Sequence, residues 1–161
     1  QAVFHYCPKT KSNNPFELGI ASPPMLAEAW QYGDGKLLMD GTFGICLYKI
    51  LLIVMLVIDE SYTGVPVALF LFSAPLGNRQ TSSGHDAAIL RQFLSEWKCA
   101  LGQKEGMPFT PKICMTETNV KEINALKFVW AVIIALLSMF HIFQSLKNRL
   151  IKELGRGGPP H

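Results

Sequence analysis

The hydrophobic and polar positions of the chain divide it into short apolar runs and amphipathic segments. Five apolar runs have the length and composition of strands; they are residues 36–43, 49–59, 65–72, 111–116 and 132–137. The run at residues 50–58 is apolar throughout, which indicates a central strand covered on both faces. Pro66 has no N–H group to donate to a sheet, so we expect the third strand to lie at a sheet edge.

Three further segments show the 3.6-residue spacing of amphipathic helices. They are residues 85–101, 119–130 and 141–154. Gly102 ends the first of them, and Asn119 with Glu122 three residues later predicts an N-cap for the second. Three strands followed by helices that alternate with strands indicate an α/β fold, in which helices flank a mixed sheet.

Length and composition favour one folded domain with tails. A chain of 161 residues is long enough to bury one core and too short for two comfortable ones. Residues 1–35 contain four prolines and only a weak helical pattern, so we expect a mostly irregular lead-in. Residues 36–154 are the expected core and residues 155–161 a flexible tail. Because the chain begins at Gln1 rather than Met, we expect it to be a fragment of a longer protein.

The apolar content raises the question of membrane association, because hydrophobic residues make up 49% of the chain and charged residues 17%. The longest apolar runs are interrupted by Lys49 and by His141. They therefore fall short of the ~18–20 unbroken apolar residues that a spanning helix needs. Buried strands are the favoured interpretation, with no membrane partner, and a membrane-associated protein is the alternative.

Positive charge is concentrated near the C-terminus. The net charge of +3 is too small to indicate nucleic-acid binding by itself. The last predicted helix and the tail, however, carry four basic residues against the single acid Glu153: Lys147, Arg149, Lys152 and Arg156. These side chains are candidates for weak contact with phosphates, although a basic helix face is more often simply solvated.

The cysteines point to a reducing, intracellular compartment. Cys7, Cys46, Cys99 and Cys114 show no CxxC spacing and fall mostly in apolar segments. Neither a zinc site nor a disulfide framework is indicated. The N-terminus also lacks a basic and then apolar leader, so secretion is unsupported.

Asp40 is the strongest candidate for chemistry. It lies inside the first predicted strand, between Met39 and Phe43. An unpaired carboxylate in an apolar setting is costly, so we expect Asp40 to find a partner or to hold a metal ion. A structural role in a turn is the plainer alternative.

Four stretches together resemble a known family. They read MDGTFG at residues 39–44, VPVALFLFSAP at 65–75, ICMTETNVKE at 113–122 and MFHIFQ at 139–144. In order and spacing they resemble the transposase domain of Mutator-like elements (MULE), especially its fungal forms, over roughly residues 36–154. The resemblance implies an RNase H-like fold. The strand pattern and Pro66 predict a five-stranded mixed sheet in the spatial order 3-2-1-4-5, with the second strand antiparallel to its neighbours. The resemblance also implies a nuclear protein of a transposable element that cleaves and joins DNA with three carboxylates and two Mg²⁺ or Mn²⁺ ions.

The resemblance assigns roles to individual residues. The family's first acid falls on Asp40 and its second on Glu117, where the family has an aspartate after the threonine. The third acid, a glutamate, lies in the family beyond a helical insertion that this chain does not reach. Ser138 stands where the family has the cysteine of a Cys-x-x-His element ending at His141. Asp40 and Glu117 are therefore the expected catalytic and metal-binding residues.

The expected site is too incomplete for catalysis by this chain alone. Glu117 carries one methylene too many, and an error of about 1 Å can cost ~100-fold in rate. Glu122 is the remaining candidate for a third acid, but its spacing from Asn119 favours helix capping. A non-catalytic domain of the same fold, domesticated to bind DNA or another transposase chain, is the alternative function.

Overall fold

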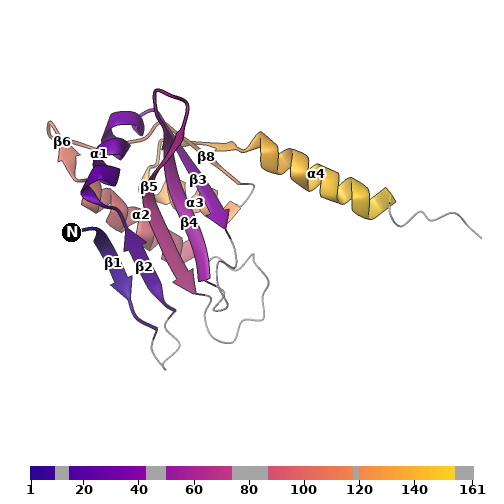
Figure 1. Cartoon of the computed structure of the whole chain (residues 1–161), viewed down its shortest axis with the longest axis horizontal. Coiled ribbons are helices and arrows are strands. Elements are labelled where there is room, and N and C mark those ends of the chain that lie inside the picture. The colour runs from indigo at the N-terminus through magenta and orange to yellow at the C-terminus, as the bar shows by residue number, and fades with distance from the viewer. Residues whose placement is uncertain (10–14, 43–49, 74–86, 118–119, 155–161) are drawn as a thin grey trace, which may run out of the picture.

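The computed structural model describes residues 1–9, 15–42, 50–73, 87–117 and 120–154. Within these residues the chain forms a mixed α/β structure with a seven-stranded sheet, a small separate hairpin and four helices (Figure 1). The strands are β1 (Val3–Cys7), β2 (Glu17–Ile20), β3 (Lys36–Thr42), β4 (Ile50–Ile58), β5 (Gly64–Ser73), β6 (Gln103–Lys104), β7 (Met107–Pro108), β8 (Ile113–Thr116) and β9 (Ile134–Leu137). The helices are α1 (Pro23–Tyr32), α2 (Ala87–Leu101), α3 (Val120–Val129) and α4 (Met139–Leu154).

The large sheet has the strand order β1-β2-β5-β4-β3-β8-β9. β4 is antiparallel to both of its neighbours, β3 and β5, whereas β8 and β9 continue the sheet parallel to β3. The expectation of five strands was too low, because the N-terminal strands β1 and β2 extend the sheet beyond β5. β4 covers residues 50–58 of the strand predicted at residues 49–59.

Residues 1–35 were expected to be mostly irregular, and this was wrong. They contain two paired strands, and α1 covers the weak helical pattern that the sequence showed there. α1 begins with Pro23 and Pro24, a position where a missing N–H group costs nothing because the first N–H groups of a helix have no partner within it. The prolines of this region therefore mark element ends and do not prevent order.

Pro66 does not place β5 at a sheet edge, contrary to the expectation. β5 lies between β4 and β2, but β2 pairs only with residues 69–72 of β5. Pro66 lies outside that paired stretch, and the β4–β5 register shifts between Met55 and Leu56, beside it. β5 is thus an internal strand at one end and an edge strand at the other. No residue of β2 pairs with Pro66, so the missing N–H group of this proline costs no hydrogen bond on the β2 side.

The helices α1, α2 and α3 pack on one face of the sheet. β4 alternates between fully and partly buried side chains, and Ile53 and Met55 lie on the fully buried face. On that side Phe70 of β5 stacks on Phe93 of α2 with ring centroids 5.2 Å apart. α2 presents the predicted apolar side chains to this core: Ile89, Leu90, Phe93, Leu94, Trp97 and Leu101. α1 joins the same layer, since Trp30 Nε1 donates to the Leu101 carbonyl oxygen at 2.9 Å.

α4 has a different position from the other helices. It begins one residue after β9 and projects away from the sheet (Figure 1). Among the described helices none is long and apolar enough to cross a membrane.

Candidate functional site at the ends of β3 and β8

Asp40 lies on the face of the sheet opposite to α2 and α3. Along β3 the side chains of Leu37 and Met39 are buried on the helical side, and those of Leu38 and Asp40 point to the other face. Asp40 is exposed, so the expectation of a carboxylate enclosed by apolar neighbours was wrong. The alternation of the strand places it where no described helix packs, and it is accessible to solvent and to a ligand.

Glu117 comes directly after β8, which pairs parallel to β3 with Leu38 opposite Met115. Two residues further along each chain are Asp40 and Glu117. Because side chains alternate along a strand, this register carries both carboxylates toward the same face, at the neighbouring ends of two parallel strands. Glu117 is partly buried.

A pocket with a volume of about 280 Å³ lies beside Asp40. Seven residues line it: Leu38, Met39, Asp40, Leu56, Met115, Thr116 and Ser138. The lining is mainly apolar, with one carboxylate and two residues that carry hydroxyl groups. Ser138 joins β9 to α4, so the last helix begins at the rim of this pocket.

Glu122 approaches the same strand ends from the opposite, helical side. It lies in the first turn of α3 with only 2% of its surface exposed, and it accepts a hydrogen bond from the Thr116 hydroxyl at 2.5 Å. A side chain at Gly41 would place its Cβ 4.0 Å from Glu122 Oε1, so Glu122 also lies close to β3. The predicted cap with Asn119 falls outside the described residues and stays a prediction.

The buried carboxyl of Glu122 contributes to a raised pKa of the Cys114 thiol. Burial raises the pKa of the Cys114 thiol to about 12, and the charge of Glu122 adds to the rise. Cys114 is therefore a neutral thiol that packs in the core, and it is unsuited to act as a nucleophile or as a metal ligand.

The metal-binding potential of the site rests on oxygen ligands. Asp40 and Glu117 supply the hard oxygens that Mg²⁺ and Mn²⁺ prefer. In the part of the chain that the structure describes, however, no three His, Cys, Asp or Glu side chains come together as a metal-binding group. Two carboxylates at adjacent strand ends fit one loosely held divalent ion better than a fixed pair.

The basic residues predicted to contact nucleic acid lie on α4. Lys147, Arg149 and Lys152 are exposed there, and Arg156 falls outside the described residues. α4 starts directly after Ser138, which lines the pocket beside Asp40, and the helix projects away from the sheet (Figure 1). His141 belongs to the first turns of the same helix.

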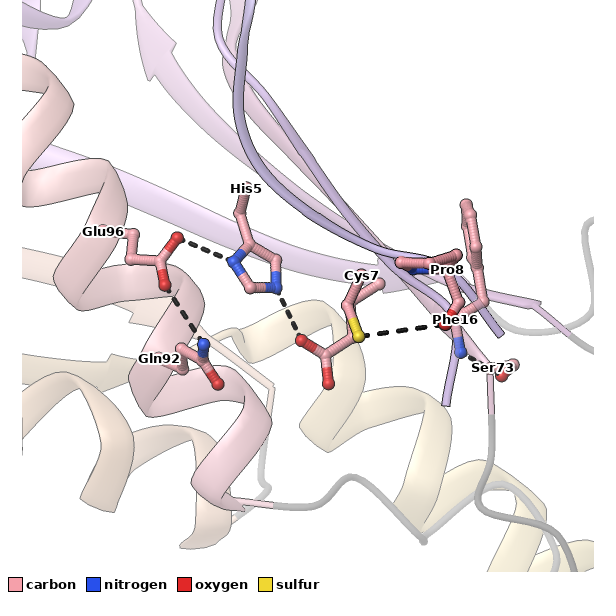
Figure 2. A network of polar contacts seen from close by, with 8 residues as sticks. His5, Cys7, Pro8, Phe16, Ser73, Gln92 and Glu96 are labelled. Atoms are coloured by element: carbon pink, nitrogen blue, oxygen red, sulfur yellow. Dashed lines mark hydrogen bonds and ion pairs between the residues drawn. The ribbon is translucent and has the colours of Figure 1, made fainter. Parts of the chain in front are cut away.

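A cluster that sequence reasoning missed joins the N-terminal strands to α2 (Figure 2). His5 Nε2 lies 2.6 Å from a carboxylate oxygen of Glu17, and His5 Nδ1 lies 2.7 Å from one of Glu96. Gln92 donates a further hydrogen bond to Glu96 at 3.1 Å. The imidazole ring of His5 thus bridges a carboxylate on β2 and a carboxylate on α2. No sequence signal could have found this cluster, since His5 and Glu96 are 91 residues apart.

No model of a known protein family matches this chain. A comparison with curated proteins likewise finds no match.

Proposed function

We propose that this chain is a transposase-derived, RNase H-like domain that binds DNA and whose active relatives cut and join it. The observation that carries the proposal is the placement of Asp40 and Glu117 at the neighbouring ends of the parallel strands β3 and β8. Catalytic carboxylates of a metal-dependent nuclease must converge from different strands in this way. The resemblance of the sequence to the MULE transposase domain assigns its first two acids to the same two residues.

The strand order supports the proposed fold. Within the sheet, β5-β4-β3-β8-β9 is the order 3-2-1-4-5 when these five strands are numbered along the chain. The antiparallel setting of β4 against both neighbours agrees with it. On this proposal β1 and β2 are an addition at the edge of an RNase H-like sheet.

The proposed chemistry is phosphodiester displacement that depends on Mg²⁺ or Mn²⁺. Divalent ions in such a site activate water or a 3′-hydroxyl and stabilise the leaving oxygen. Asp40 and Glu117 would hold the metal, while the basic side chains of α4 would bind DNA phosphates through counterion release. Because no three acids come together among the described residues and Glu117 is longer than the family's aspartate, this chain alone should bind DNA in the nucleus without cutting it.

The second candidate function is a non-catalytic domain of the same fold that binds DNA or another transposase chain. It is favoured by the apolar lining of the pocket beside Asp40. An apolar surface of this kind suits protein contact better than it suits a polyanion.

DNA binding tests the proposal directly. We expect fluorescence anisotropy with a labelled duplex to give weak, sequence-independent binding that falls steeply as salt rises. Arg149→Glu combined with Lys152→Glu should weaken it. Lys104→Glu combined with Lys127→Glu, the same number of charge reversals at exposed sites on β6 and α3, should change it little. Binding that is absent at low salt, or that responds equally to both kinds of variant, would remove DNA from the proposal.

Metal dependence gives the second test. Mg²⁺ titration followed by calorimetry should show no site much tighter than roughly millimolar, as expected for few protein ligands, and Asp40→Asn should remove whatever binding is present. Plasmid nicking in Mg²⁺ or Mn²⁺ should be absent. Nicking that Asp40→Ala abolishes would support the nuclease site and contradict its inactivity, and Glu122 would then be the third acid to test.

A further inference from the structure

The chain carries two large apolar surfaces that nothing in its described residues covers. The first is the face of the sheet opposite to α2 and α3, which we call the open face. Its residues include Leu38, Leu52, Val54, Leu56, Leu69, Leu71, Met115 and Leu136, as the strand registers show. Met115 and Leu136 are 39% and 42% exposed. An apolar face of this extent marks a surface that another element normally covers.

The second surface is the apolar side of α4. Its exposed hydrophobic residues are Phe143, Leu146, Leu150 and Ile151, each more than half exposed. They recur at the spacing of one helical face, with Lys147 beside them and Arg149 and Lys152 on the polar side. A helix that exposes such a face usually lays it into an apolar groove.

We propose that the chain forms a two-fold dimer in which α4 of each copy lies across the open face of the other. One chain that carries both a helix and a helix-accepting face is self-complementary, and a reciprocal exchange satisfies both surfaces with one symmetry operation. The dimensions agree. The 16 residues of α4 are about 24 Å long. The part of the sheet formed by β5, β4, β3, β8 and β9 is about 19 Å wide at a strand spacing of ~4.8 Å.

The connection between β9 and α4 favours a second copy over the chain's own sheet. β9 ends at Leu137 and α4 begins at Met139, so Ser138 is the whole connection. Strand-to-helix connections usually have two or more residues when the helix folds back onto its own sheet. α4 instead continues outward from the edge of the sheet, where a second molecule can meet it (Figure 1).

The charges of the two surfaces are complementary. Asp40 is an exposed acid on the open face, beside the pocket that Leu38 and Met115 line. Lys147 lies one helical turn from both Phe143 and Ile151, within the apolar side of α4. A docked helix would bring this ammonium group to a carboxylate, and attraction between the two would fix the register of the helix. The inference does not rest on the proposed function, because the apolar surfaces carry it, and in the dimer Asp40 would face Lys147 in place of a metal ion.

Sedimentation velocity over a wide concentration range tests the dimer. We expect the wild-type chain to dimerise, and Leu150→Glu on α4 and Leu136→Glu on the open face each to weaken dimerisation roughly tenfold or more. Asn148→Glu, which introduces the same glutamate side chain on the polar side of α4, should leave the dimer intact. Circular dichroism shows whether each variant is folded, and Met115→Glu replaces Leu136→Glu if the latter is not.

Mixing the two disrupted variants provides the decisive measurement. The Leu150→Glu chain keeps an intact open face and the Leu136→Glu chain an intact helix, so one correct contact forms only between unlike chains. Equimolar mixing should therefore restore association that neither variant shows alone. A wild-type monomer at all concentrations would overturn the proposal, as would sensitivity to Leu150→Glu without sensitivity to Leu136→Glu, since α4 would then pair with α4. Binding of a monomer to phosphatidylserine vesicles through α4 would overturn it in favour of a lipid surface.

Discussion

The Thr116 hydroxyl donates a 2.5 Å hydrogen bond to the carboxyl of Glu122, and both side chains are almost fully buried, at 1% and 2% exposure. The contact joins the end of β8 to the first turn of α3. It lies on the opposite side of the strand ends from Asp40. At the C-terminal ends of β3 and β8, the structure thus places a buried, hydrogen-bonded acid on one face of the sheet and an exposed acid on the other.

Thr116→Val should destabilise the protein by about 1–3 kcal/mol, because it keeps the shape of the side chain and leaves a buried carboxyl without this donor. Urea unfolding followed by fluorescence should show a lower midpoint with an unchanged slope. Thr110→Val is the control, since Thr110 is exposed and should cost less than about 0.5 kcal/mol. Equal losses in the two variants would mean that the hydrogen bond to Glu122 contributes nothing specific.

His5, on the edge strand β1, offers a second test of stability. His5→Ala leaves Glu17, which is 8% exposed, without this hydrogen-bond partner, and should cost about 1–3 kcal/mol. Glu96→Ala should cost less than about 1 kcal/mol, because more than a third of that side chain is exposed and solvent screens the interaction. Hydrogen exchange should then become faster in β1 and β2 for His5→Ala. Unchanged exchange there would show that the cluster does not hold the N-terminal strands.

Cys114 should be the least reactive of the described cysteines. Burial, with a smaller contribution from Glu122, raises its pKa from 9.0 to about 12, so the reactive thiolate is scarce at pH 8. Pulse alkylation with iodoacetamide and site-resolved mass spectrometry should label exposed Cys99 rapidly and Cys114 only on unfolding. Comparable labelling of the two in the folded protein would contradict the burial argument.

The same pKa shift predicts a dependence of stability on alkaline pH. A thiol whose pKa is higher in the folded state contributes stability that is fully present below its unfolded pKa, near 9. That stability is lost as the pH rises from about 9 toward 12. The unfolding free energy should fall over this range, and the fall should be smaller in Cys114→Ala, although that variant starts less stable because of its cavity.

The sequence predicted the elements that local periodicity defines. The run of β4 and the apolar stripe of α2 are repeated patterns within one segment, and both elements form where expected. The antiparallel setting of β4 followed as well, since strands in a meander reverse direction at each turn.

The structural features that the sequence did not predict depend on contacts between segments far apart in the chain. β1 and β2 have no strong pattern of their own: β2 is ordered by pairing with β5, more than 40 residues away, and β1 by pairing with β2. The edge predicted from Pro66 failed because the length of β2, not the proline, decides where β5 is exposed. The exposure of Asp40 likewise follows from which face α2 and α3 cover, and the alternation within β3 is compatible with either face.

A charge exchange between Asp40 and Lys147 tests the geometry of the proposed dimer most closely. Reversing one partner, in Lys147→Glu, should bring two carboxylates together and weaken dimerisation about two- to fivefold, the range expected for an exposed ion pair. Asp40→Lys alone should weaken it similarly by opposing two ammonium groups. Both substitutions in one chain restore opposite charges across each of the two contacts, so the double variant should dimerise close to the wild-type level. Screening by salt should shrink all three differences, because both side chains are exposed. If the losses of the single variants simply add in the double variant, Asp40 and Lys147 do not meet, and α4 lies in another register on the open face.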